Sequence, residues 1–275
     1  MNRRMIFYVI GQIINIEAAL LLLPAAVSFY YREECLTAFL TTAGIALVVG
    51  LILTFTSRPG NHLIYAKDGF VIVTLAWLAM SVIGAVPFVI SGEMPNYIDA
   101  FFETVSGFTT TGASVLTDVE KMSKGLLFWR SFTHWIGGMG VLVFVMVVIP
   151  NISDRSIHMI RAEMPGPIVG KLVPKLKNTA KILYLIYIVM TAAEVIFLLC
   201  GGMSLYDSVV HAFGTAGTGG FGIKADSLAG YSPYLQWVIA IFMLLFGINF
   251  NIYYLILIRR FRSAFRSTEM WSYIG

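Results

Sequence analysis

Two short stretches of this chain combine glycine and threonine in a way that suits the binding of a passing cation. One stretch is Thr109, Thr110, Thr111, Gly112 and Ala113, and the other is Ala216, Gly217, Thr218, Gly219 and Gly220. Glycine lets a backbone turn its carbonyl groups toward an ion, and threonine adds a hydroxyl oxygen. Carbonyl oxygens of such loops can replace the hydration shell of a cation inside a membrane. Both stretches are therefore candidate segments of an ion filter.

The two stretches belong to a repeated pattern. Aligning Thr111–Gly112 with Thr218–Gly219 makes Gly112 and Gly219 the corresponding glycines of the two copies. Each copy follows a short apolar segment, at 96–108 and at 204–214, that is too short to cross a membrane of about 30 Å. We predict two re-entrant helices, each followed by a loop.

The rest of the chain predicts the surroundings that such loops need. Hydrophobic residues make up 58% of the 275 residues and charged residues 12%, with a mean hydropathy of +0.80. A soluble domain carries about 25% charged residues, so the chain is an all-α integral membrane protein. Six apolar segments approach the length of about 20 residues that a spanning helix needs. They are 5–27, 35–56, 70–90, 125–150, 180–201 and 235–258.

The basic residues predict the orientation of these spans. With a cytoplasmic N-terminus, 14 of the 19 lysines and arginines fall on the inside and five on the outside. The five outside are Arg32, Lys121, Lys124, Arg130 and Lys224. Such an excess on one side orients membrane proteins, so we predict cytoplasmic N- and C-termini and external filter loops. The spread of basic residues between spans gives no sign of a nucleic-acid partner.

Two other interpretations of the loops are weaker. Two ordinary external loops would leave Phe101, Phe102 and Phe221 in water, where they are poorly placed. The glycines at 217, 219 and 222 also match the spacing of a dinucleotide-binding loop, but no strand precedes them and no acidic residue follows about 20 positions later. No metal-ligand spacing or nucleophile motif is present either, so we expect neither an enzyme nor a bound cofactor.

Residues near the loops receive supporting roles in this interpretation. Glu103 and His211 lie on the two short segments, where we expect them to form hydrogen bonds behind the filter, with a position at the wet pore mouth as the alternative. Asp99 and Asp207 begin those segments and are expected to cap them. Three glycines in the following span, at 137, 138 and 140, are expected to allow close helix packing.

The motifs together resemble the bacterial potassium uptake proteins of the Trk and Ktr type. The resemblance rests on Ser106–Ser114, on His134–Val141 and on Phe213–Gly222, and it covers essentially the whole chain. It implies four membrane–pore–membrane repeats around one pore, with Gly112 and Gly219 as filter glycines of the first two. It also implies K⁺ uptake across the bacterial inner membrane, a homodimer, and a cytosolic nucleotide-binding subunit that gates the pore.

Only the N-terminal half of that pattern is present in this chain. We assign 1–60 to a leading helix pair, 61–155 and 156–268 to two repeats, and 269–275 to the start of a missing third repeat. We therefore expect a truncated form of a pore-forming subunit, surrounded by membrane lipid, that does not transport K⁺ by itself. The alternative is a non-conducting relic or regulatory subunit that associates with a full-length transporter.

Overall fold

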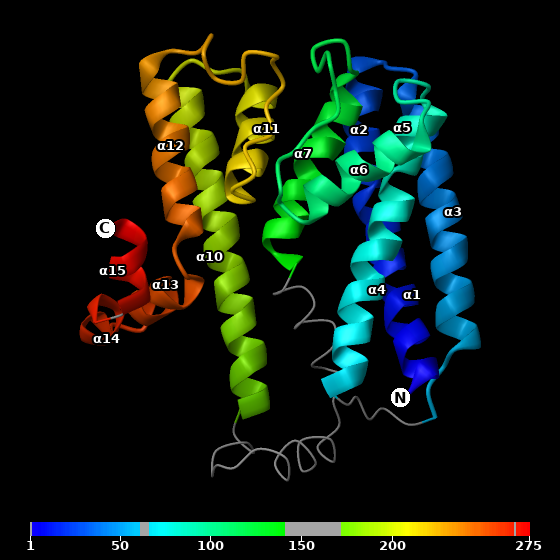
Figure 1. Ribbon diagram of the computed structural model, residues 1–275, viewed down its shortest axis with the longest axis horizontal. Coiled ribbons are helices and arrows are strands. Elements are labelled where there is room, and N and C mark those ends of the chain that lie inside the picture. Colours follow the sequence, from blue (N-terminus) through cyan, green and yellow to red (C-terminus); the bar gives the residue numbers. More distant parts are fainter. Residues whose placement is uncertain (1, 61–65, 141–171, 267) are drawn as a thin grey trace.

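The computed structural model describes residues 2–60, 66–140, 172–266 and 268–275, and every regular element in those ranges is an α-helix. The helices form two groups that meet where α7 (Lys124–Gly138) packs against α11 (Leu205–Ala216) (Figure 1). The first group holds α1 to α6, and the second holds α10 and α12 to α15.

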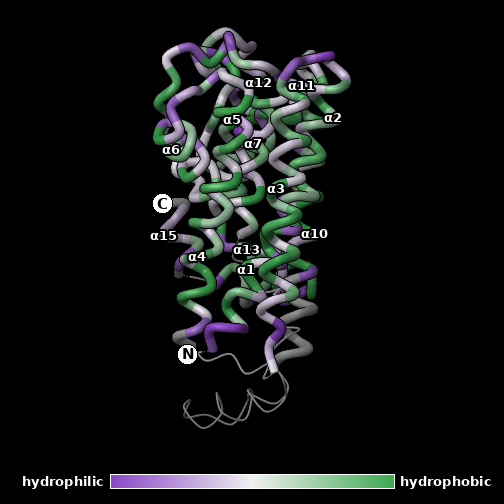
Figure 2. The backbone as a smooth tube through the Cα atoms, turned by 90° about the vertical axis from the view of Figure 1, so that its right-hand side faces the viewer, coloured by the Kyte–Doolittle hydropathy of each residue, from purple (hydrophilic) through white to green (hydrophobic). Residues whose placement is uncertain are grey.

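Four apolar helical stretches of the described chain are long enough to cross a membrane. They are Arg3–Tyr31, Cys35–Thr56, Asp68–Ile90 and Lys181–Cys200. Figure 2 shows hydrophobic residues along these rods and hydrophilic residues gathered toward their ends. The spans predicted at 5–27, 35–56, 70–90 and 180–201 are therefore confirmed as membrane-length helices.

The helices that make up these stretches are not all continuous. The first stretch consists of α1 (Arg3–Leu20) and α2 (Leu22–Tyr31), and the second is α3 (Cys35–Thr56). The third lies within α4 (Ala66–Gly84) and α5 (Val86–Ile90), and the fourth lies within α10 (Leu172–Cys200). Pro87 lies in the first turn of α5, where its missing N–H interrupts the ladder of backbone hydrogen bonds least.

The leading pair, α1 and α3, packs through two facing glycines. A Cβ built on Gly11 would lie 2.9 Å from the carbonyl oxygen of Gly50, and a Cβ on Gly50 would lie 2.9 Å from that of Gly11. Small residues at such a crossing let two backbones approach closely in a membrane. Asn15 also donates to the hydroxyl of Thr54 across this contact, at 3.4 Å.

The span predicted at 125–150 begins as α7, and residues 141–150 lie outside the described residues. The span predicted at 235–258 is wrong as a continuous helix. α12 (Pro233–Gly247) is followed by Ile248, which is extended with ψ 139°, and α13 (Phe250–Leu257) leaves in a new direction (Figure 1). The apolar run continues through the break, so hydropathy alone does not reveal it.

Tyrosine hydroxyls supply the hydrogen bonds that this break removes. Tyr253 donates to the carbonyl of Leu245 at 2.7 Å, and Tyr273 donates to that of Leu244 at 3.3 Å. The last carbonyls of a helix need such partners. Tyr273 belongs to α15 (Thr268–Ile274), which follows α14 (Phe261–Phe265) and folds back onto the end of α12.

Two shorter helices carry the candidate loops. α6 (Tyr97–Phe108) and α11 have 12 residues each, or about 18 Å, and cover only part of the membrane depth. Both lie toward the end of the molecule opposite the N-terminus (Figure 1). The short helices predicted at 96–108 and 204–214 are thus present, and both candidate loops follow them.

Asparagine and serine, rather than the expected aspartates, cap these helices. Asn96 accepts a hydrogen bond from the backbone N–H of Ile98 at 3.0 Å, and Ser204 accepts one from that of Asp207 at 3.1 Å. Asp99 and Asp207 lie in the first turn instead, where a negative charge is favourable. The expectation that these two aspartates are the caps is therefore wrong by three positions.

Candidate ion filter

The loops after α6 and α11 have the same backbone conformation. Thr110 and Thr218 both have φ 56°, and Gly112 and Gly220 have φ 76° and 75°. The turns are closed in the same way: the N–H of Thr110 donates to Gly107 at 2.9 Å, and that of Thr218 donates to Thr215 at 2.8 Å. Positive φ in a threonine is unusual, so its occurrence at the same point of both loops indicates a shared architecture.

This geometry corrects the register of the repeat. Tyr97 and Leu205, which begin the two helices, are separated by 108 positions, as are Gly112 and Gly220. Aligning Thr111–Gly112 with Thr218–Gly219 shifted the copies by one residue, so the counterpart of Gly112 is Gly220 rather than Gly219. The identical Thr-Gly pairs favour the other alignment, but what repeats in the backbone is a threonine with positive φ followed two residues later by a glycine with positive φ.

The corrected register also moves the second stretch. Its counterpart of Thr109–Ala113 is 217–221, and Ala216 corresponds to Phe108 at the end of the helix. Ala216 is 4% exposed and packs with Met139, Tyr187 and Phe246, so its side chain belongs to the core.

Threonine hydroxyls and one backbone carbonyl of the first predicted filter stretch already form local hydrogen bonds. The hydroxyl of Thr109 lies 2.7 Å from that of Thr111 and donates to the carbonyl of Val105, also at 2.7 Å. The carbonyl of Ala113 accepts a hydrogen bond from Ser106 at 2.6 Å. These bonds hold the first loop to the end of its own helix.

The two loops touch each other. A Cβ added to Gly112 would collide with the backbone carbonyl of Gly219. The structure therefore brings the two predicted stretches together, although more than a hundred residues separate them in the sequence. Only a residue without a side chain permits this approach at position 112.

α7 lies between the two short helices, and Gly137 and Gly138 at its end, with Gly140 just after it, allow close packing. A Cβ on Gly137 would collide with the carbonyl of Phe108, and one on Gly138 would lie 3.2 Å from that of Ala216. A Cβ on Gly140 would collide with the ring of Trp77. The packing role expected for these three glycines is confirmed.

His134 of α7 fills the space beside the second loop. It is fully buried, and its ring stacks on that of Phe221 with centroids 3.8 Å apart. A Cβ on Gly219 would collide with the same imidazole. Gly219 is therefore restricted by a neighbouring side chain, whereas Gly220 is restricted by its own φ.

A buried charge pair connects the two loops. One carboxylate oxygen of Glu103 accepts hydrogen bonds from the hydroxyl of Ser114 and from the N–H of Val115, the latter at 3.1 Å. The other oxygen lies 3.5 Å from Nε of Arg130. The role of Glu103 in hydrogen bonding behind the first loop is confirmed, and Glu103 is only 1% exposed.

Arg130 extends this connection to the second loop. Its Nη1 donates to the carbonyl of Gly222 at 3.1 Å, and its Cζ lies 3.5 Å from the ring centroid of Phe221. Sequence reasoning counted Arg130 only as an external charge. The available signal was an arginine inside a predicted apolar span, since ionisable groups at membrane depth are functional candidates.

This is an integral membrane protein built from re-entrant helix-and-loop repeats. Its two short helices end in loops that match and touch each other, and membrane-length apolar helices surround them. The chain belongs to the TrkH cation transport protein family, which matches residues 36–273. It is 36% identical to the Trk system potassium uptake protein TrkH of Salmonella typhimurium over an alignment of 281 residues, which covers 100% of this chain and 58% of that relative.

A relative from Vibrio parahaemolyticus, named as a Trk system potassium uptake protein, is 33% identical over 258 residues and 92% of this chain. The crystal structure of the potassium transporter TrkH from Vibrio parahaemolyticus matches the fold with a TM-score of 0.78 and 32% identity, over 92% of this chain and 52% of that one. The chain spans about half the length of the curated relatives it matches. The predicted fold class and the resemblance to Trk-type proteins are confirmed.

Proposed function

We propose that this chain forms part of a pore that carries K⁺ across a membrane, with the loops around Gly112 and Gly220 as two walls of the filter. The observation that carries the proposal is the pair of loops with the same left-handed residues, in contact between Gly112 and Gly219. Relatives named as potassium uptake proteins support K⁺ as the cargo.

The electrostatics of the two short helices favour a cation at the loops. The C-terminal end of a helix carries roughly half a negative charge, and α6 and α11 both end where the loops begin. Positive φ at alternate residues rotates successive peptide groups toward one side of the chain, where their carbonyls can replace the water around an ion. We assign the coordination of the ion to Thr109–Ala113 and 216–220, and the corrected register adds residue 221.

The orientation and partners belong to the same proposal. The excess of 14 basic residues over five favours a cytoplasmic N-terminus and external loops, in a bacterial inner membrane. The sequence and the resemblance also support a cytoplasmic C-terminus, a homodimer and a cytosolic nucleotide-binding subunit. They support the division of the chain into 1–60, 61–155, 156–268 and 269–275. Transport without enzymatic chemistry or a bound cofactor completes the proposal.

A flux measurement tests it. The 275-residue chain and an extended version, which includes any coding sequence found downstream, are reconstituted in liposomes and expressed in a bacterium that lacks potassium uptake. We expect K⁺ flux and rescue from the extended version, and loss of both with Gly112→Ser. If the 275-residue chain and the extended version are both stably folded but neither carries K⁺, the result would contradict the proposal and favour the non-conducting subunit.

A further inference from the structure

His211, behind the second loop, forms different hydrogen bonds from those of Glu103, its counterpart behind the first loop. Glu103 and His211 occupy corresponding positions, 108 residues apart, on α6 and α11. Glu103 reaches Ser114 and Val115 of its own loop. His211 instead places Nδ1 2.8 Å from the carbonyl of Asp207, one turn earlier in the same helix.

This bond leaves the other ring nitrogen of His211 without a hydrogen-bond partner among the described residues. Because Nδ1 donates to a carbonyl, Nε2 of the neutral ring is an acceptor. His211 is only 4% exposed, so bulk water does not reach the nitrogen freely. The large majority of buried polar atoms of this kind have a hydrogen-bond partner, either in the protein or in ordered water.

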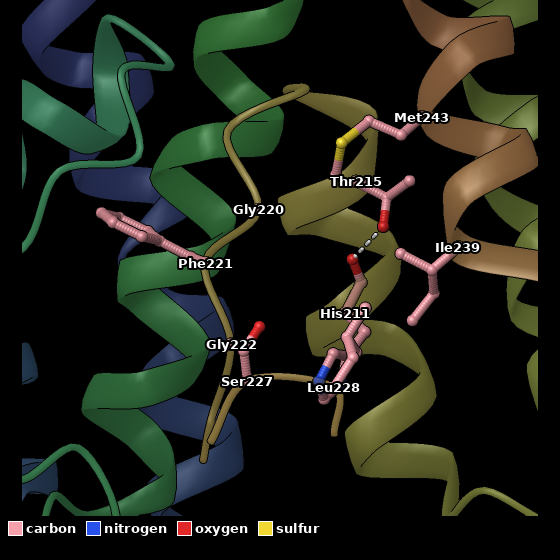
Figure 3. Close-up of a pocket in the computed structure, with 9 residues that line it drawn as sticks. All are labelled: His211, Thr215, Gly220, Phe221, Gly222, Ser227, Leu228, Ile239 and Met243. Carbon is pink, nitrogen blue, oxygen red and sulfur yellow. Dashed lines mark hydrogen bonds between the residues drawn. The ribbon is translucent and has the colours of Figure 1, made fainter. Parts of the chain in front are cut away.

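His211 lines a pocket of about 110 Å³ between α11, the loop after it and α12. Figure 3 shows the side chains of His211, Thr215 and Ser227 around this space, with Gly220 and Gly222 of the loop beside it. Thr215 donates its hydroxyl hydrogen to the carbonyl of His211 at 2.8 Å, so toward any further partner its hydroxyl oxygen acts as an acceptor. Ile239 and Met243 of α12 form an apolar wall.

We infer that this pocket holds ordered water, through which His211 supports the second loop. A buried water needs two to four polar partners and about 10–15 Å³ of space measured in this way, so the pocket is large enough for more than one. Water donates to Nε2 and bonds to Thr215, Ser227 and the backbone near Gly220. The first loop is thus held by a carboxylate and the second by water, and His211 is a positioning residue.

This inference rests on the proposed function only where it concerns ion selectivity, so its structural part is tested separately. A high-resolution structure of the extended version should show water density within hydrogen-bond distance of Nε2. The density should persist in His211→Gln, whose amide reaches about as far as Nε2, and disappear in His211→Phe. A dry pocket, at a resolution that shows other buried waters, would overturn the inference whether or not the protein conducts.

The ratio of K⁺ to Na⁺ flux tests the positioning role. His211→Phe should lower this ratio roughly fivefold, as loss of one net hydrogen bond of about 1 kcal/mol predicts, and His211→Gln should restore most of it. Ile239→Phe, which fills the pocket from α12, should act like His211→Phe. Ile241→Phe is the matched control, because Ile241 lies on the same helix and is 50% exposed.

The two failures are distinguishable. A parent protein that conducts K⁺, with unchanged selectivity in both His211→Phe and Ile239→Phe, would overturn the positioning role and leave the proposed function intact. A parent that conducts no K⁺ would remove the proposed function, and the water density would then decide the inference alone. If His211→Phe fails to fold, Ile239→Phe and the density in the parent still give a decision.

Discussion

Glu103 and Arg130 form a buried ion pair in which a carboxylate oxygen lies 3.5 Å from Nε, with the side chains 0% and 4% exposed. Glu103 also binds the first loop at Val115, and Arg130 binds the second at Gly222. The pair therefore joins the two candidate filter walls to each other and to α7.

Removing both members of this pair should cost less stability than the two single removals added together. Arg130→Leu leaves the carboxylate buried without its counter-charge, which costs about 3–5 kcal/mol in comparable pairs. Glu103→Leu with Arg130→Leu should cost less than the sum of the single changes. The temperature at which half of the detergent-solubilised protein is lost from its monodisperse peak measures this. Additive losses would show that the two residues act independently.

The glycines at 219 and 220 should respond differently to changes in their surroundings. Gly219→Ala collides with His134, so adding His134→Ala should recover folding and uptake. Gly220→Ala has open space, with Met243 3.7 Å away, but places a side chain at φ 75°. This costs about 1–2 kcal/mol, which no neighbouring change relieves.

K⁺ uptake and protein yield of the two single and two double variants check this distinction. Gly44→Ala is the control, because a Cβ there would meet nothing within 4 Å. Equal recovery of Gly219→Ala and Gly220→Ala by the smaller residue at 134 would contradict the assigned register.

The orientation is open to cysteine labelling. In a background of Cys35→Ser and Cys200→Ala, a cysteine at exposed Ala225 should react with a membrane-impermeant maleimide added outside intact cells. A cysteine at exposed Gly60 should react only after the membrane is opened, since it follows α3 at the opposite end. Reaction at Gly60 alone in intact cells would reverse the topology and remove the external filter.

The crossing of α1 and α3 predicts a position-specific effect within one helix. Gly50→Leu should destabilise the protein by about 1–3 kcal/mol, because the added side chain meets Asn15 and the backbone of Gly11. Gly44→Leu on the same helix points into open space and should be tolerated. Both changes gain similar helix propensity, so the difference in thermal stability isolates the packing. Equal stability of the two variants would mean that the crossing does not depend on Gly50.

Much of the architecture follows from the sequence alone. Long apolar segments are recognised because transfer from water to lipid is summed residue by residue, and four of the six predicted spans appear as membrane-length helices. The two short helices follow from the same pattern, since segments of this length cannot span. Gly137 and Gly138 also appear where close packing was predicted, because small residues in an apolar span have few other uses.

Contacts between distant residues were decided only by the tertiary structure. Arg130 and Gly222 are 92 positions apart, and no local pattern announces that they meet. Near the break at Ile248, Tyr273 returns from α15 and donates to the carbonyl of Leu244 at the end of α12. Gly112 and Gly220 are recognised as equivalent positions of the two repeats by their φ angles. The sequence match of Thr111–Gly112 to Thr218–Gly219 does not reveal this equivalence. Hydropathy and motifs specify which segments enter the membrane, whereas side-chain packing between helices specifies which residues face each other there.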